Sequence, residues 1–273
     1  MESGSRVVLV TGASSGLGAA CARALSARGH RVYGASRRAG TDAPAAGAPI
    51  PLAMDVTDEA SVGAAVAALL AREGRLDVVV NNAGVGLAGS IEDTAVDEAR
   101  ALFETNLFGV HRVCRATLPL LRAQGDGLVV NVGSIGGRVA IPFQGFYSAS
   151  KAALHVFNDA LRGELAPFGV RVVLVEPGDF RTGFTASRVF ARAGAGSPYA
   201  SRCARAVGVM EADERAGADP ESLAARVVDI VEGRARGTRH LAGRLSQRLV
   251  ARLAPWLPDA LLDRGLRAYY ERD

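Results

Sequence analysis

The N-terminal stretch Val7–Gly18 reads VVLVTGASSGLG, a short apolar run followed by closely spaced glycines. The apolar run favours a strand, and the alanine-rich residues after the glycines have helical periodicity. Glycine lets the backbone turn tightly and approach a pyrophosphate, which binds the unpaired N–H groups at the positive end of the following helix. A plain tight turn is the alternative, but this position in the first strand–turn–helix unit favours dinucleotide binding. The candidate cofactor-binding residues of the turn are Gly12, Ser14, Ser15, Gly16, Leu17 and Gly18.

The same alternation of strand and helix continues along the chain. Apolar runs predict strands at Val7–Val10, Arg31–Ala35, Leu52–Met54, Val78–Val80, Leu128–Val132 and Val170–Val175. Helical periodicity predicts helices at Gly18–Arg28, Glu59–Arg72, Val96–Leu121 and Phe146–Leu165. Such alternation, with right-handed crossovers, produces a parallel sheet covered on both faces. The predicted fold class is α/β, a doubly wound parallel sheet of the Rossmann type, as a single domain over residues 1–273 with ligands at the carboxyl ends of the strands.

Several segments lie outside this pattern. Thr41–Pro51, rich in Ala, Gly and Pro, is a predicted surface loop. Gly183–Gly217 has weak periodicity and several glycines, and we expect a mobile substrate loop or lid, the usual role of a long loop in a compact domain. Arg239–Ala242 is a candidate seventh strand. Gly243–Asp273 is a predicted helical tail that covers the sheet, the substrate cleft or a sister subunit, or alternatively lies on a membrane surface.

Composition excludes several classes of protein. The 273-residue chain is 49% hydrophobic and 22% charged, as in ordinary globular proteins. Its net charge of +4 comes from arginines interspersed with acidic residues, without a basic stripe, so nucleic acid is not an expected partner. Cys21, Cys114 and Cys203 are far apart, and we expect neither a disulfide nor a metal site. There is no signal segment and no apolar run near the roughly 20 residues of a membrane span, so we expect a soluble cytoplasmic protein.

The end of the second predicted strand indicates which dinucleotide binds. Ser36, Arg37 and Arg38 stand where an acidic residue would accept hydrogen bonds from the ribose 2′-hydroxyl of NAD. A small hydroxyl followed by guanidinium groups instead suits a 2′-phosphate. The sequence therefore favours NADP(H) over NAD(H), and the alternative is that the arginines form only a solvated basic turn.

The third and fourth predicted strands end at the same edge, where the adenosine should bind. Asp55 and Val56 close the third strand, and Asn82, Ala83 and Gly84 follow the fourth. Asn82 bonds the backbone and the cofactor in one interpretation and is a turn former in the other. These residues complete the candidate cofactor edge of the sheet.

Lys151 is the only lysine among the 32 Lys and Arg residues, which leaves 31 arginines. An ammonium group can give up a proton, whereas a guanidinium stays charged at any working pH, so this position has a chemical need for an amine. Tyr147 lies four residues earlier, on the same face of a predicted helix. Ser134 ends the fifth predicted strand, where its hydroxyl and the phenol of Tyr147 can converge.

These motifs together resemble the short-chain dehydrogenase/reductase family: TGASSGLG (Thr11–Gly18), NNAG (Asn81–Gly84), Ser134, Tyr147-x-x-x-Lys151, and Pro177-Gly178 followed by Thr182. The resemblance covers Val7–Thr185, about two thirds of the chain. The glycine spacing and chain length match the single-domain branch of the family. Within that branch, Gly29–Arg38 and the tail are most similar to the 17β-hydroxysteroid and retinol dehydrogenase-like group.

The resemblance implies a role for each matching residue. Tyr147 is the general acid/base, Ser134 holds the substrate oxygen, and Lys151 bonds the nicotinamide ribose and lowers the pKa of the tyrosine. Asn106 supports a water that leads to Lys151. Contact with the nicotinamide carboxamide is implied for Pro177, Gly178, Phe180 and Thr182. The family also pairs its equivalents of the Val96–Leu121 and Phe146–Leu165 helices across a two-fold interface, which implies a homodimer or homotetramer.

The chemistry of a phenol agrees with these roles. A free phenol has a pKa of about 10, so nearby cations are needed for it to act near neutral pH. Aromatic residues near the predicted substrate mouth indicate an apolar substrate: Phe143, Phe146, Phe180 and Phe184. We expect an NADP-dependent oxidoreductase that transfers hydride between the nicotinamide and the carbonyl or secondary alcohol of a small, largely apolar substrate. The alternatives are an NAD-dependent alcohol dehydrogenase working in the oxidative direction and a dinucleotide-sensing protein without chemistry.

Overall fold

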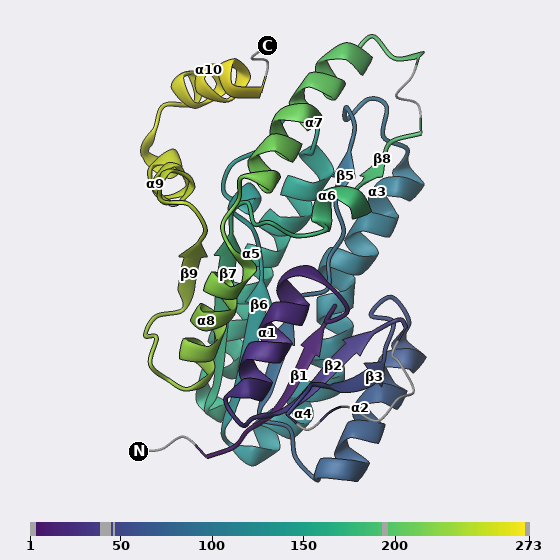
Figure 1. The fold of residues 1–273 in the computed structure, drawn as a ribbon, viewed down its shortest axis with the longest axis vertical. Helices are drawn as coiled ribbons and strands as arrows, with labels where there is room; N and C mark the ends of the chain where they lie inside the picture. Colours follow the sequence, from purple (N-terminus) through teal and green to yellow (C-terminus); the bar gives the residue numbers. More distant parts are fainter. Residues whose placement is uncertain (1–3, 39–44, 46, 193–195, 271–273) are drawn as a thin grey trace.

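A seven-stranded parallel sheet forms the centre of the molecule (Figure 1). The computed structural model describes residues 4–38, 45, 47–192 and 196–270. The sheet order is β3-β2-β1-β4-β6-β7-β9, and every neighbouring pair is parallel. The chain leaves β1 toward one edge and later crosses to the other, so the carboxyl ends of β1 and β4 flank a topological switch point, where ligands bind in such sheets. The strands are β1 (Val7–Thr11), β2 (Arg31–Ser36), β3 (Ile50–Ala53), β4 (Val78–Asn81), β6 (Gly127–Val132), β7 (Val170–Pro177) and β9 (Arg239–Ala242).

Helices cover both faces of the sheet (Figure 1). On one face, α1 (Gly16–Ala27) packs against α8 (Pro220–Val231). The other face is covered by α2 (Glu59–Glu73), α4 (Gly109–Gln124) and α5 (Gly145–Leu165). A separate cluster of buried apolar residues lies under each layer. The predicted doubly wound α/β fold is confirmed.

Alternate residues of β1 serve the two layers. Val8 and Val10 belong to the cluster under α1 and α8, whereas Leu9 belongs to the cluster under α2, α4 and α5. Successive side chains of a strand point to opposite faces, and both faces are buried here. The run VVLV is therefore apolar throughout, without the polar alternation of a half-exposed strand.

Local signals fix the ends of several elements. Asp58 caps α2, because its carboxylate accepts hydrogen bonds from the N–H groups of Ala60 (2.8 Å) and Ser61 (3.3 Å). Arg239–Ala242 is a strand, as predicted. Of the predicted loop Thr41–Pro51, residues 41–44 and 46 lie outside the described residues. Its last two residues, Ile50 and Pro51, pair with β2 as part of β3.

The predicted single helix Val96–Leu121 has three parts. α3 (Val96–Phe103) continues through a π-helical turn, Glu104–Phe108, into α4. A π turn widens the helix locally, and such turns are frequent at functional sites. Asn106 lies in this turn and is fully buried. The π turn therefore places the polar side chain of Asn106 in the interior of the protein.

The segment Gly183–Gly217, predicted as a mobile substrate loop or lid, contains two helices and a short strand. Only part of α7 is buried, and its charged residues are scattered between apolar ones, so helical periodicity is weak in the sequence. The role of this segment in binding substrate stays a prediction, and its residues 193–195 lie outside the described residues. Its elements are α6 (Phe184–Ser187), β8 (Val189–Phe190), which pairs with β5 (Leu87–Ala88), and α7 (Ala200–Arg215).

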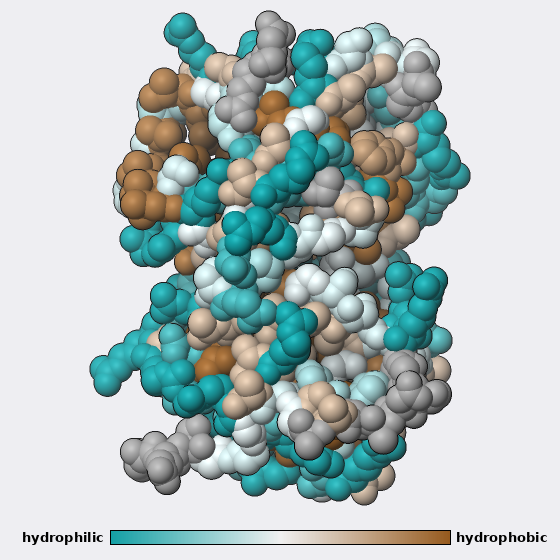
Figure 2. Space-filling view, viewed as in Figure 1, coloured by the Kyte–Doolittle hydropathy of each residue, from teal (hydrophilic) through white to brown (hydrophobic). Residues whose placement is uncertain are grey.

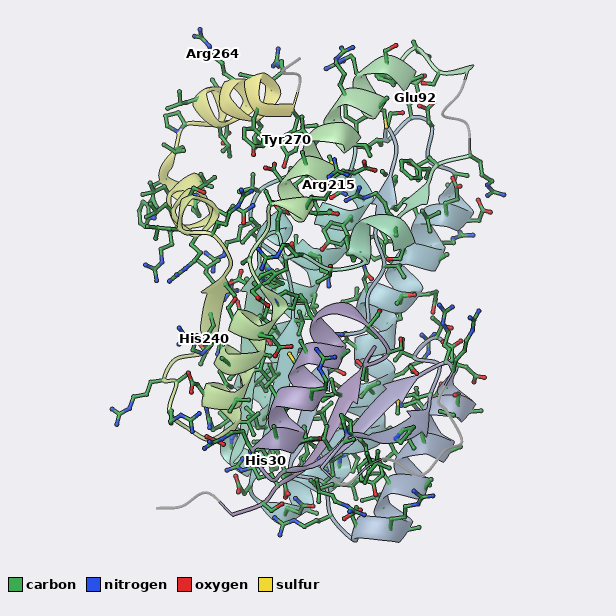
Figure 3. The ribbon with its side chains drawn as sticks, in the orientation of Figure 1. His30, Glu92, Arg215, His240, Arg264 and Tyr270 are labelled. Atoms are coloured by element: carbon green, nitrogen blue, oxygen red, sulfur yellow. The ribbon has the colours of Figure 1, made fainter. Side chains whose placement is uncertain are left out.

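The C-terminal tail forms two helices, as predicted, and residues 271–273 lie outside the described residues. α9 (Leu245–Leu253) and α10 (Asp259–Tyr270) flank a turn that contains Trp256, which is 85% exposed. Hydrophobic side chains gather over this region in Figure 2. α10 packs against α7 (Figure 3), where the hydroxyl of Tyr269 donates to Asp213 (2.6 Å). Among the described helices, none is both long and apolar enough to cross a membrane.

Candidate active site

The glycine-rich turn joins β1 to α1 and brings the two backbones into close contact. Gly12 and Gly16 have φ angles of 66° and 55°, in the left-handed region that glycine favours. A Cβ on Gly18 would lie 2.3 Å from the carbonyl oxygen of Gly12, so only glycine fits there. The first N–H groups of a helix have no partner within it, and the N-cap residue Ser15 makes no side-chain capping bond. The turn, which includes Ser14 and Leu17, therefore has the cradle and the donors that a dinucleotide pyrophosphate requires.

Asn82 ties this turn to β4. The side-chain amide of Asn82 donates to the carbonyl oxygens of Thr11 (3.0 Å) and Gly12 (3.2 Å). The backbone N–H groups of Asn82 and Ala83 donate to the hydroxyl of Thr11 (3.0 and 3.1 Å). Asn82 thus bonds backbone, as one of the two interpretations requires, and its contact with the cofactor stays a prediction.

The predicted 2′-phosphate site lies at the end of β2. Arg37 and Arg38 are both exposed, and the hydroxyl of Ser36 donates to the carbonyl oxygen of Arg38 (3.1 Å). Across from them, Asp55 accepts hydrogen bonds from the N–H (2.9 Å) and hydroxyl (2.7 Å) of Thr57. These bonds lower the pKa of Asp55, and the charge of Arg37 acts in the same direction. Arg37 is therefore near Asp55, at the edge where the adenosine is predicted to bind, and Val56, the residue after Asp55, is buried.

Lys151 is buried on α5, with its ammonium group at the end of β6. Its Nζ donates to the carbonyl oxygen of Val132 (3.0 Å) and lies 6.0 Å from the centre of the Tyr147 ring. Burial lowers the pKa of Lys151 to about 8. The ammonium is then mostly protonated near neutral pH, yet close to the range in which it can lose its proton. The two side chains share one face of α5, as predicted.

Tyr147 and Ser134 flank the same small space. A Cβ on Gly136 would lie 3.3 Å from Oγ of Ser134 and 3.4 Å from Cε1 of Tyr147. Burial raises the pKa of Tyr147, and a hydrogen bond with Ser134 lowers it. The carboxylates of Glu214 and Asp179 raise the pKa of the phenol further. The phenol is therefore held protonated until a cation or a hydrogen-bond donor favours its ionised form.

Asn106 reaches the same site from the π turn. Its Oδ1 accepts from the N–H of Val85 (2.9 Å), and its Nδ2 donates to the carbonyl oxygen of Val85 (3.0 Å) and to Ser150 (3.1 Å). A Cβ on Gly84 would lie 3.4 Å from Oδ1 of Asn106 and 3.5 Å from Nζ of Lys151. Asn106 and Lys151 thus both lie beside Gly84, whereas a water between them stays a prediction.

The loop after β7 closes over the glycine-rich turn. A Cβ on Gly16 would lie 3.4 Å from Cβ of Thr182, so the two segments are in contact. The N–H of Gly178 donates to the carbonyl oxygen of Ala242 in β9 (2.9 Å), which fixes the loop after Pro177. The side chain of Phe180 is only 4% exposed and packs in the cluster under α1 and α8. Phe180 is therefore a core residue and no part of the substrate mouth, so only its backbone is available to a cofactor.

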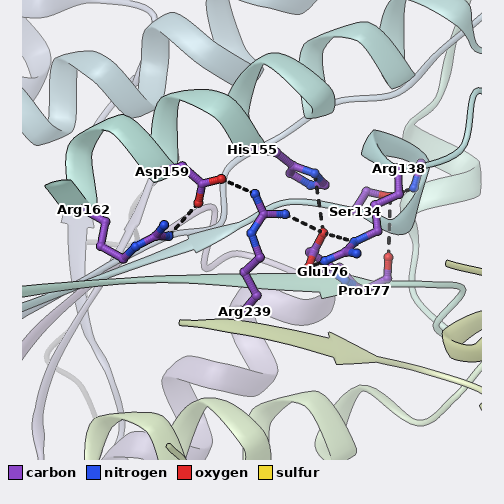
Figure 4. A network of polar contacts seen from close by, with 9 residues as sticks. Ser134, Arg138, His155, Asp159, Arg162, Glu176, Pro177 and Arg239 are labelled. Carbon is purple, nitrogen blue, oxygen red and sulfur yellow. Dashed lines mark hydrogen bonds and ion pairs between the residues drawn. The ribbon is translucent and has the colours of Figure 1, made fainter. Parts of the chain in front are cut away.

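A buried network of charges lies beside the loop between Ser134 and Tyr147 (Figure 4). Glu176 of β7 is fully buried and accepts two hydrogen bonds from Arg138 (2.6 and 2.8 Å). Nδ1 of His155 lies 3.5 Å from Glu176, and burial lowers the pKa of this histidine to about 4, so its ring is neutral near neutral pH. A Cβ on Gly137 would lie 2.6 Å from the ring, which packs directly under the loop between Ser134 and Tyr147. The sequence analysis does not predict this network. Its one indication in the sequence is an acidic residue, Glu176, within the mostly apolar strand β7.

A second buried pair is also missed, because it lies in the segment with weak periodicity. Arg188 donates a hydrogen bond to Glu214, and the side chain of Arg188 is fully buried. Both charges act on the pKa of Tyr147. The substrate side of the site is therefore more polar than the aromatic residues of the sequence indicate.

The cysteines take no part in this site. Cys21 and Cys114 are buried, and burial raises the pKa of each thiol to about 12. Cys203 is a third free thiol, partly exposed on α7. Across the described ranges, His, Cys, Asp and Glu form no group that could hold a metal ion.

Known proteins resemble this chain over most of its length. A sequence profile described as short chain dehydrogenase matches residues 6–192. The 3-ketodihydrosphingosine reductase of Bacteroides thetaiotaomicron is 41% identical over 266 residues, 97% of this chain and 98% of that protein. A short-chain dehydrogenase from Streptomyces avermitilis superposes with a TM-score of 0.79 at 34% identity, covering 97% of this chain and 99% of its own. One from Burkholderia cenocepacia, in complex with NADP, superposes with a TM-score of 0.74 at 28% identity and the same coverage, 97% and 99%.

The fold and the matched residues place the chain among nucleotide-dependent oxidoreductases. It belongs to the short-chain dehydrogenase/reductase family, whose members act on carbonyl and alcohol groups. The narrower resemblance to the 17β-hydroxysteroid and retinol dehydrogenase-like group is not tested by these relatives and stays a prediction.

Proposed function

We propose that this protein is an NADPH-dependent ketone reductase for a long-chain, largely apolar substrate, with Tyr147 as its general acid. The observation that carries the proposal is the convergence of Ser134, Tyr147 and Lys151 at the carboxyl edge of the sheet, beside the glycine-rich turn. The reductase of Bacteroides thetaiotaomicron, which aligns over 97% of the chain, supports the reductive direction.

Each residue of the site has a defined task in this reaction. When bound, the nicotinamide would supply the hydride for reduction of the carbonyl carbon. The hydroxyl of Ser134 donates a hydrogen bond to the carbonyl oxygen, and Tyr147 gives its proton to the same oxygen as negative charge develops there. The ammonium of Lys151 then stabilises the phenolate that remains. The raised pKa of Tyr147 suits this direction, because the phenol is protonated before the step.

The cofactor is held by four parts of the chain in this proposal. The pyrophosphate binds the turn from Gly12 to Gly18, and the 2′-phosphate binds Arg37 and Arg38. Lys151 bonds the nicotinamide ribose, and the loop Pro177–Thr182 contacts the carboxamide. The preference for NADPH over NADH rests on the two exposed arginines and on the lack of an acidic residue at the end of β2.

The proposed substrate class is a long-chain amino ketone. The substrate named for the Bacteroides relative, 3-ketodihydrosphingosine, has an apolar chain, a ketone, an amine on the neighbouring carbon and a terminal hydroxyl. In this chain the ring of Phe184 lies 6.0 Å from that of Tyr147 and provides an apolar wall beside the reaction centre. A dinucleotide sensor is disfavoured, because it has no use for a buried lysine beside a phenol.

The proposed assembly is a homodimer or homotetramer. Apolar side chains on the helices expected to pair are exposed in the single chain: Val96 (66%), Phe108 (45%) and Val156 (72%). Burying them against a second copy would remove apolar surface from water. The cytoplasmic location stays a prediction.

The reaction is tested with purified protein, NADPH and 3-ketodihydrosphingosine, by following loss of nicotinamide absorbance. We expect turnover with NADPH to exceed turnover with NADH. A long-chain ketone without the amine serves as comparison substrate. Tight NADPH binding without reduction of either ketone would contradict the proposal, and faster oxidation of the corresponding alcohol with NAD would support the oxidative alternative.

A further inference from the structure

A buried ion pair lies on the segment between β7 and α8. Arg188 precedes β8, and Glu214 lies in the last turn of α7. Nη2 of Arg188 donates to Oε1 of Glu214. The arginine side chain is fully buried and that of the glutamate is 12% exposed. Neither residue is needed for the transfer of hydride and proton described above.

The pair lies next to the reaction centre. Phe184 is the link, because its ring lies 6.0 Å from the Tyr147 ring. A Cβ on Gly86 would lie 2.9 Å from the Phe184 ring and 3.7 Å from Cγ of Arg188, so Arg188 and Phe184 line the same backbone. The charges of both Arg188 and Glu214 also act on the phenol of Tyr147. A ligand group bound by the pair would therefore be close to the carbonyl that Tyr147 protonates.

The pair leaves polar atoms without a partner. Within the described part of the chain, Nε and Nη1 of Arg188 and Oε2 of Glu214 are buried and form no hydrogen bond. An unsatisfied buried polar group costs roughly 1–3 kcal/mol, and more for a charged group. Native proteins satisfy nearly all such groups. An ammonium group could donate to the free carboxylate oxygen, and a hydroxyl on the neighbouring carbon could accept from a free guanidinium nitrogen.

The charges around the pair favour a cation. Asp179 and Asp213 lie in the same cluster, together with Arg244, which is 3.1 Å from Asp213 and 4.0 Å from Asp179. Three carboxylates thus face two guanidinium groups. Burial raises the pKa of Glu214 to about 7, and the charge of Asp179 acts in the same direction, against the charge of Arg188. A bound ammonium group would add a second positive charge beside this carboxylate.

We propose that Arg188 and Glu214 form the subsite for the polar end of an amino ketone substrate. In this arrangement the substrate ammonium donates to Oε2 of Glu214, and Nη1 of Arg188 donates to the substrate hydroxyl oxygen. The inference rests on the proposed ketone reductase and specifies which ketones it prefers. A purely structural ion pair is the competing explanation, and it predicts no discrimination between substrates.

The test compares two ketones in wild-type protein and in Glu214→Gln. One is 3-ketodihydrosphingosine, and the other has hydrogen in place of the amine. The wild type should favour the amino ketone in kcat/KM by about 10- to 100-fold, the range for one charge-assisted contact worth roughly 1.5–3 kcal/mol. Glu214→Gln should lose that preference, mainly through KM. Glu211→Gln, one turn earlier on α7 and 3.6 Å from the exposed Arg215, is the matched control and should keep it.

A second measurement needs no variant. A long-chain 2-amino alcohol should inhibit the wild type, and its N-acetylated form, which has no charge, should inhibit at least about tenfold more weakly. Equal inhibition, or a preference retained in Glu214→Gln, would overturn the subsite. Reduction of both ketones at equal efficiency by the wild type would overturn the subsite and leave the ketone reductase standing. Reduction of neither ketone would overturn the proposed function and the subsite with it.

Discussion

Nζ of Lys151 lies 6.0 Å from the centre of the Tyr147 ring, one turn further along α5. The pKa values of the two groups are shifted in opposite directions: burial raises the pKa of the phenol and lowers that of the ammonium to about 8. Burial disfavours both charged forms, whereas a phenolate and an ammonium side by side stabilise each other, which brings both pKa values back toward their ordinary values. These shifted pKa values are what the proposed proton transfer to a substrate oxygen would use.

The buried ammonium makes stability depend on pH. The folded-state pKa of about 8 lies below the ordinary value of 10.5, so between pH 7 and pH 9 the unfolded chain binds more protons than the folded one. The free energy of unfolding then rises with pH over this window. Relative to Lys151→Met, which has no titrating amine, wild type should gain about 1 kcal/mol from pH 7 to pH 9. Urea unfolding at both pH values measures this, and parallel changes in the two proteins would show that the amine is not perturbed.

Arg37→Asp should shift cofactor preference from NADPH toward NADH. The substitution removes a cation from the proposed 2′-phosphate site and places a carboxylate where it can accept from a ribose hydroxyl. We expect NADPH affinity to fall at least about tenfold, as for loss of one charge-assisted bond. Fluorescence titration with both nucleotides measures the change. Arg23→Asp, on the outer face of α1, makes the same change of charge away from the proposed phosphate site and should keep the preference for NADPH. An unchanged preference for NADPH in Arg37→Asp would exclude contact between Arg37 and the 2′-phosphate.

Gly18→Ala should abolish cofactor binding and destabilise the fold. Its Cβ would lie 2.3 Å from the carbonyl oxygen of Gly12 and 2.4 Å from Nδ2 of Asn82, so the turn must open. Gly63→Ala is the matched control, because Gly63 lies in α2 with nothing within 4 Å of its Cβ. That variant should gain about 0.5–1 kcal/mol from better helix propensity. Thermal unfolding and NADPH titration measure the stability and the cofactor affinity of both variants. Equal stability and equal NADPH affinity in Gly18→Ala and Gly63→Ala would contradict the prediction.

Glu176→Gln should destabilise the protein by about 3–5 kcal/mol, because Arg138 loses a buried countercharge. The loop between Ser134 and Tyr147 rests on this network through His155, so turnover should fall as well. Glu164→Gln, at an exposed position of α5, should change stability by less than about 0.5 kcal/mol. Chemical unfolding of the two variants gives the comparison. A loss below about 1 kcal/mol in Glu176→Gln would show that the network does not depend on the charge.

Periodicity and spacing predict the sheet, the helices that cover it and the convergence of Tyr147 with Lys151, because these follow from local patterns and parallel topology. The π turn at Asn106 is not predictable in this way, since a single widened turn leaves the apolar pattern intact. The start of α8 is predictable from the sequence, because Asp219 is a favoured N-cap residue and Pro220 is favoured at the first position of a helix. The apolar residues of α8 alone do not show whether the segment is a helix or a strand. The pairing of Arg188 with Glu214 depends on tertiary contacts between residues 26 positions apart, which no local pattern encodes.

The most direct test of the account replaces Tyr147 by phenylalanine. The variant keeps the ring and loses only the hydroxyl that donates the proton, so NADPH affinity should be unchanged while kcat for the ketone falls at least about 100-fold. Tyr33→Phe, which removes a phenol hydroxyl hydrogen-bonded to Glu73 far along β2, is the control and should keep its turnover. Turnover by Tyr147→Phe within a few fold of wild type would contradict the assignment of Tyr147 as the general acid.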